Sequence, residues 1–66
     1  MSTLAKNIAR FRKDAGMTQE ELADKLDIAR PAVARYERGN RKPTPERLSE
    51  LADALGVTTD ALLGRV

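Results

Sequence analysis

One predicted helix, which runs to about Arg38, is unusually rich in arginine. At 100° per residue, Val33 and Tyr36 mark its buried side. The opposite side is expected to carry Arg30, Pro31, Ala34, Arg35 and Arg38. A guanidinium offers a planar fork of donors that matches phosphate oxygens and the O6 and N7 acceptors of guanine. The chemistry predicted for this face is therefore the binding of a polyanion.

A second predicted helix lies just before the first, over residues 18–26. Thr18 and Glu21 have the spacing of a capping box, in which each side chain hydrogen-bonds the backbone amide of the other residue. The helix is expected to end near Leu26, and Gly39 is a natural stop for the arginine-rich helix. Two short helices joined by a tight turn can lie across a DNA backbone and place the second in the major groove.

Apolar spacing and cap residues predict three more helices that would support this pair. The expected elements are residues 3–15, residues 45–55 and a last short helix beginning at Thr58. Pro45 suits a first helical position, where a missing amide costs nothing. With no strand pattern and no linker, the sequence predicts an all-α fold in a single domain over residues 1–66.

These segments resemble the phage-repressor and Cro-like helix-turn-helix domains, the Xre-type family of bacterial and phage regulators. The resemblance rests on TQEELADKL, VARYERG, RKPTPERLSELADALGV and TTDALL, and covers the chain from Ile8 onward. It implies a five-helix, lambda-repressor-like domain with the helix-turn-helix at helices 2 and 3. It also implies a sequence-specific transcriptional regulator, expected to be a repressor, that binds a palindromic operator in double-stranded DNA as a weak homodimer.

Roles for individual residues follow from the resemblance and from the predicted faces. Base contacts are expected from Arg30, Pro31, Ala32 and Arg35. Phosphate contacts are expected from Thr18, Gln19, Arg38, Asn40, Arg41 and Lys42, with Gln19 also bracing a recognition side chain. A structural ion pair is expected between Arg12 and Glu37, and a dimer surface at Val57, Leu62, Leu63 and Val66.

The chain departs from the family pattern at three positions. Asp27 stands where the turn usually has glycine, and aspartate tolerates left-handed φ better than most residues. Ala29 stands where a serine or threonine cap is usual, which forgoes roughly 1 kcal/mol. Pro31 biases Arg30 toward extended backbone. We therefore expect this helix to start one residue late, with Arg30 as its cap.

Composition limits the other possible functions. The chain has no cysteine and no histidine, so no thiolate or imidazole is available for catalysis or for binding a metal. We expect no enzymatic activity, no cofactor and no metal. No apolar run approaches the roughly 20 residues of a membrane span, and the N-terminus lacks a signal-peptide core. The expected location is cytoplasmic and nucleoid-associated.

The distribution of charge favours DNA over the main alternative, a protein-interaction module on the same fold. The net charge is only +2, but residues 30–47 hold six basic and two acidic residues. This basic segment contains the proposed recognition helix and the loop after it. A protein-docking helix should instead present an apolar or mixed face.

Overall fold

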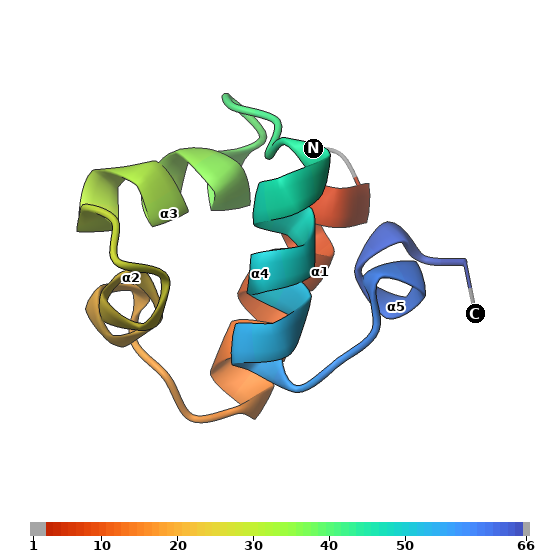
Figure 1. Cartoon of the computed structure of the whole chain (residues 1–66), viewed down its shortest axis with the longest axis horizontal. Helices are drawn as coiled ribbons and strands as arrows, with labels where there is room; N and C mark the ends of the chain where they lie inside the picture. The colour runs from red at the N-terminus through yellow and green to blue at the C-terminus, as the bar shows by residue number, and fades with distance from the viewer. Residues whose placement is uncertain (1–2, 66) are drawn as a thin grey trace.

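The computed structural model describes residues 3–65 and contains five α-helices within that range. Figure 1 shows the helices packed together at different angles, and the described residues include no strand. Their bounds are α1 Thr3–Asp14, α2 Gln19–Leu26, α3 Arg30–Arg38, α4 Pro45–Leu55 and α5 Thr59–Leu63. The predicted five-helix, all-α fold is therefore confirmed, and α1 ends one residue earlier than expected.

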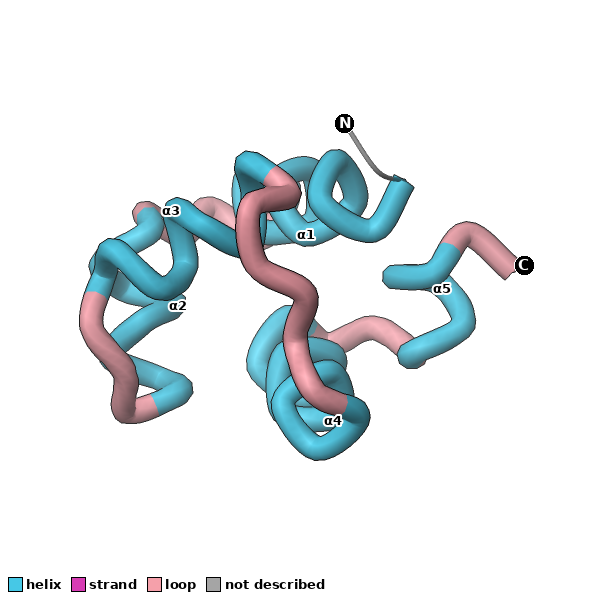
Figure 2. The backbone as a smooth tube through the Cα atoms, turned by 90° about the horizontal axis from the view of Figure 1, so that it is seen from above, coloured by secondary structure: helices cyan, strands magenta, loops and turns pink. Residues whose placement is uncertain are grey.

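The helix pair occupies one side of the molecule. In Figure 1, α2 and α3 lie at the left, α1 and α4 in the middle, and α5 at the right. α2 packs against α3 and α4, while α1 contacts α3, α4 and α5. Figure 2 shows the loop between α3 and α4 crossing the molecule from the α1 side. The scaffold therefore supports α3 from behind and leaves its outer side in solvent.

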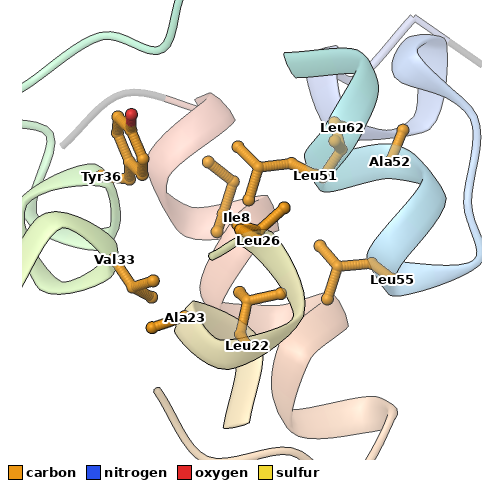
Figure 3. Packing of buried hydrophobic residues seen from close by; sticks show 10 residues of the cluster. All are labelled: Ile8, Leu22, Ala23, Leu26, Val33, Tyr36, Leu51, Ala52, Leu55 and Leu62. Carbon is orange, nitrogen blue, oxygen red and sulfur yellow. The ribbon is translucent and has the colours of Figure 1, made fainter. Parts of the chain in front are cut away.

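The core is apolar and draws on every helix. Its largest fully buried side chains are Ile8, Leu22, Val33, Leu51 and Leu62. Figure 3 shows Leu22, Ile8, Leu51 and Leu62 pointing toward a common centre. Tyr36 is also buried, as predicted, and its hydroxyl points away from the other labelled side chains. Burying each large apolar side chain contributes about 1.5–3 kcal/mol, so these residues supply most of what holds the helices together.

Local signals determine where most of the helices begin and end. α2, α4 and α5 each start after a threonine, and its hydroxyl accepts a backbone N–H three residues later. The capping box of Thr18 and Glu21 is complete. α2 ends at Asp27, which adopts the left-handed region at φ 57°, and α3 ends at Gly39 at φ 78°. Aspartate therefore fills the glycine position of the turn without a change of fold.

The start of α3 differs from the prediction. Ala29, at φ −76° and ψ 144°, is the N-cap, so the helix begins at Arg30 and not one residue later. Pro31 occupies the second helical position, where it has no amide to satisfy. The amide of Ala32 donates to the Ala29 carbonyl at 3.0 Å. These two features reduce the number of free donors at this end, so a side-chain cap is less needed than the sequence suggests.

Candidate nucleic-acid interface

The outer face of α3 is basic, but it is narrower than predicted. Arg35 and Arg38 are exposed, as is Pro31. Ala34, predicted to face solvent, is only 6% exposed. The Val33–Tyr36 stripe indicated a narrower buried arc than the structure has, because α3 packs against both α2 and α1. Arg30 lies on the same row as Ala34, at i and i+4, but is exposed at the start of the helix.

The predicted ion pair between Arg12 and Glu37 is present and buried. Arg12 Nε donates to Glu37 Oε2 at 2.6 Å, and Nη2 donates to Oε1 at 3.1 Å. The two residues are 9% and 8% exposed. These hydrogen bonds raise the pKa of Arg12 despite the opposing effect of burial. Arg12 also donates to the Met17 carbonyl at 2.7 Å, so the pair ties α1 to α3 and to the start of the helix pair.

Gln19 connects that ion pair to the proposed reading surface. Its Nε2 donates to Glu37 Oε1 at 3.0 Å, and its Oε1 accepts from Arg30 Nη1 at 3.3 Å. This contact places Gln19 beside Arg30, the side chain that it would brace if Arg30 reads a base. The bond to Glu37 was not predicted, because Gln19 and Glu37 lie 18 residues apart and no local pattern links them.

The candidate contact residues fall into two groups, at the two ends of α3. Arg30 and Gln19 lie together at the start of the helix, while Arg35 and Arg38 lie in its last turn. The second group is Asn40, Arg41 and Lys42, exposed on the loop that follows the helix. At 1.5 Å per residue, α3 separates the groups by about 12 Å. Half-buried Ala32 is the least accessible of the proposed base contacts.

Carboxylates surround the start of α2, where Thr18 and Gln19 are the predicted phosphate contacts. The Thr18 amide donates to Glu21 Oε1 at 2.9 Å, and the Thr18 hydroxyl accepts from the Glu21 amide at 3.1 Å. The same helical turn carries the exposed Glu20 as well as Glu21. These carboxylates interact favourably with the positive end of the helix dipole, but they repel an approaching phosphate. Arg41 and Lys42 are therefore better placed for phosphate contact than Thr18.

Two further side chains hold the frame of the site and were not singled out from the sequence. Arg47 Nη1 donates to the Leu26 carbonyl at 3.3 Å, which places a cation at the C-terminal end of α2. Asn7 Nδ2 donates to the Leu62 carbonyl at 2.9 Å and thereby ties α1 to α5. Both contacts join residues far apart in the sequence, so local patterns gave no signal for them.

The predicted dimer surface is only partly available. Leu62 is fully buried in the core of the chain, so it cannot contact a partner, and its assignment to this surface was wrong. Val57 and Leu63 are half-buried and retain some apolar surface. Val66 lies outside the described residues. Leu63 also borders a shallow groove whose other lining residues are Leu4, Ala5, Tyr36, Gly39, Arg41, Lys42 and Pro43.

Among residues 3–65 there is no cluster of three or more metal-ligating side chains. Within the same range, no helix has the length and apolar character needed to cross a bilayer.

Comparison with known proteins links this arrangement to DNA-binding regulators. A family model described as helix-turn-helix matches residues 8–62. The HTH-type transcriptional regulator ImmR of Bacillus subtilis is 40% identical over 63 residues, covering 96% of this chain and 50% of ImmR. The cryptic phage CTXphi transcriptional repressor RstR of Vibrio cholerae is 37% identical over 62 residues, covering 94% of this chain and 55% of RstR.

A solved structure shows the same fold on DNA. The P22 c2 repressor, crystallised in complex with a synthetic operator, has a TM-score of 0.89 and 26% identity, with 100% of each chain covered. The chain spans about half the length of the curated relatives it matches.

Proposed function

Because the chain belongs to the helix-turn-helix family, whose model matches residues 8–62, we propose that it binds double-stranded DNA sequence-specifically as a transcriptional regulator. A repressor is the expected class, with α3 in the major groove. The observation that carries the proposal is the charge of α3: its only acidic residue, Glu37, is buried against Arg12, so its outer surface carries arginines and no acid. Such a regulator would act in the cytoplasm, at the nucleoid.

The proposed contact residues on the exposed face of α3 and those at or beyond its C-terminal end fit different tasks. Arg35 and Arg30 are long, exposed donors on the helix, so they can reach guanine, while Pro31 and Ala32 offer apolar contact to a thymine methyl. Arg38, Asn40, Arg41 and Lys42 lie at or beyond the end of the helix and are exposed. Contacts from such positions hold the protein on the phosphate backbone and carry no base information.

Salt dependence tests the proposal most directly. Selection from random duplexes would first yield a preferred site, and binding to that site would then be measured over a range of salt concentrations. Each neutralised phosphate should contribute a slope of about −0.9 in log K against log salt. Several contacts would weaken binding by orders of magnitude between about 50 and 200 mM salt. A slope near zero, or no binding at about 50 mM, would overturn the proposal.

Two matched arginine variants separate reading from positioning. Arg35→Ala should cost about 1–3 kcal/mol and relax the preference at one base position. Arg41→Ala should weaken all sequences alike and reduce the salt slope by about one unit. If Arg35→Ala weakens every sequence equally, Arg35 contacts only phosphate and its assignment to base readout is wrong.

The alternative of a protein-interaction module is disfavoured by the surface of α3. Its outer face is basic and lacks the apolar area that a docking helix presents. A chain that captures a protein partner through α3 but shows no salt-dependent DNA binding would favour the alternative.

A weak homodimer is the second part of the proposal. Half-buried Leu63 is the last residue of α5, which lies on the opposite side of the molecule from α2, and half-buried Val57 is in the loop before α5. One copy is 28 Å in its longest dimension, so two copies side by side can present two α3 helices about 34 Å apart, one turn of DNA. The operator would then be an approximate palindrome. A single copy protecting an asymmetric site would contradict the dimer without contradicting DNA binding.

A further inference from the structure

A continuous series of side-chain hydrogen bonds runs from the buried ion pair to the surface of α3. It begins at Arg12 and Glu37, passes to Gln19 Nε2 at 3.0 Å from Glu37 Oε1, and continues from Gln19 Oε1 to Arg30 Nη1 at 3.3 Å. Exposure increases along the series, since Arg12 and Glu37 are buried, Gln19 is half-buried and Arg30 is exposed. We call these four residues the relay.

Only one orientation of the Gln19 amide gives every hydrogen bond of the relay a donor and an acceptor. An ionised carboxylate accepts hydrogen bonds and cannot donate, so the Gln19 group facing Glu37 must be its NH₂. The Gln19 carbonyl then faces Arg30, whose guanidinium only donates. Turning the amide over would set its oxygen against the carboxylate and its NH₂ against the guanidinium. Both contacts would then be repulsive, so the charge of Glu37 fixes the orientation of Gln19.

This orientation presents the Gln19 carbonyl oxygen, a hydrogen-bond acceptor, to the Arg30 guanidinium. A long exposed arginine carries about 2 kcal/mol of rotamer entropy, and a fixed acceptor beside it restricts that freedom before DNA arrives. One Nη1 hydrogen is used by Gln19, and the other guanidinium donors remain for a base edge. An arginine held in this way loses less entropy on binding than a free one.

We propose that Glu37 is a specificity-determining positioning residue, which acts through the Gln19 amide to set the base preference of Arg30. The inference rests on the proposed function, because it concerns how the reading surface is arranged. Glu37 is buried on α3 against Arg12 of α1, so its carboxylate is not accessible to DNA. It nevertheless controls one base position by fixing which end of Gln19 faces outward.

The relay can be cut at its middle link without disturbing the buried charges. Gln19→Met keeps a side chain of similar length and leaves the Arg12–Glu37 pair intact. Glu37→Gln keeps the shape of the side chain but lets it donate as well as accept, so the orientation of Gln19 is no longer fixed. Glu50→Gln is the matched control, because it removes the same charge from an exposed site on α4, outside the relay.

The experiment measures binding to four duplexes that differ only at the base pair assigned to Arg30 by Arg30→Ala. Gln19→Met and Glu37→Gln should each reduce the preference among the four by roughly tenfold, and Glu50→Gln should leave it unchanged. In the Gln19→Met background, Glu37→Gln should change the preference no further. Circular dichroism at the binding temperature selects conditions in which every variant is folded, so a loss of stability cannot imitate this result.

The outcomes separate the inference from the proposed function. Wild-type protein that binds no duplex overturns both. If the wild type binds DNA and the Gln19→Met variant keeps the same base preference, the relay is overturned and DNA binding stands. Additive effects of the two substitutions would show that Glu37 acts through the general packing of α3, which also overturns the relay. Should Glu37→Gln fail to fold, Gln19→Met alone still decides whether Arg30 depends on its brace.

Discussion

The two helices of the helix-turn-helix begin in opposite ways. α2 starts with a complete capping box and two acidic residues in its first turn. α3 follows Ala29, an N-cap residue that makes no side-chain hydrogen bond. Its first turn has no acid and has a proline at the second helical position. The start of α2 can form from local interactions alone, whereas the start of α3 depends on its neighbours. The difference matches their proposed tasks, because acids that stabilise a helix N-terminus would repel a phosphate backbone.

The ion pair between Arg12 and Glu37 should be the most costly contact of α3 to remove. Arg12→Ala leaves a buried carboxylate without its partner, for which the expected loss is about 3–5 kcal/mol. Urea unfolding measures the loss, with the exposed Glu50→Ala as a control expected to change stability by less than about 1 kcal/mol. If Arg12→Ala unfolds the chain in water, the wild-type stability sets a lower limit to the loss. A loss below about 1 kcal/mol would show that α3 does not depend on this pair.

The cap of α2 should come next. Thr18→Ala removes the hydroxyl that accepts the Glu21 amide, and the expected cost is about 1 kcal/mol. Thr18→Ser keeps an accepting hydroxyl and should cost much less. Equal losses in the two variants would mean that packing of the threonine methyl, and not the capping box, stabilises the start of α2.

The same contrast explains which features could be predicted from the sequence. The N-caps of α2, α4 and α5 depend on residues within one turn, so the pattern of Thr18, Thr44 and Thr58 was sufficient to predict where these helices start. The buried state of Ala34 was missed because it depends on how α3 packs against its neighbouring helices. Leu62 was misassigned to the dimer surface because apolar spacing alone cannot tell whether a short terminal helix packs inward.

The site was predictable to a similar degree. The residue types and their order along α3 came from the sequence, and so did the pairing of Arg12 with Glu37 through the family resemblance. The link from Glu37 to Gln19 could not be predicted, because it joins side chains from two helices whose crossing geometry no local pattern encodes. Long-range contacts of this kind define the arrangement of the site, while local signals define the elements that carry it.

Adding an N-cap to α3 should increase the free energy of unfolding by less than removing the N-cap of α2 decreases it. Ala29→Ser places a hydroxyl at an N-cap that already has extended backbone. However, the Ala32 amide already donates to the Ala29 carbonyl, and Pro31 has no amide to offer. We expect a gain of only a few tenths of a kcal/mol, below the roughly 1 kcal/mol of an ordinary cap. If urea unfolding shows that Ala29→Ser gains as much stability as Thr18→Ala loses, then the Ala32 hydrogen bond and Pro31 do not compensate for the missing side-chain cap.

The smallest expected effect is a pH dependence that arises at the start of α2 and has no counterpart at the start of α3. Hydrogen bonds from the Thr18 backbone and side chain lower the pKa of Glu21 below its ordinary value of about 4.3. A carboxyl whose pKa is lowered in the folded state contributes stability above its unfolded pKa and loses it as the pH falls through the folded pKa. Wild-type protein should therefore lose slightly more stability than Glu21→Gln as the pH is lowered from 5 to 3. The carboxyl ¹³C shift of Glu21 reports its pKa directly, and a value at or above the ordinary one would contradict this account of the capping box. The first turn of α3 contains no acid, so its start should make no matching contribution in this pH range.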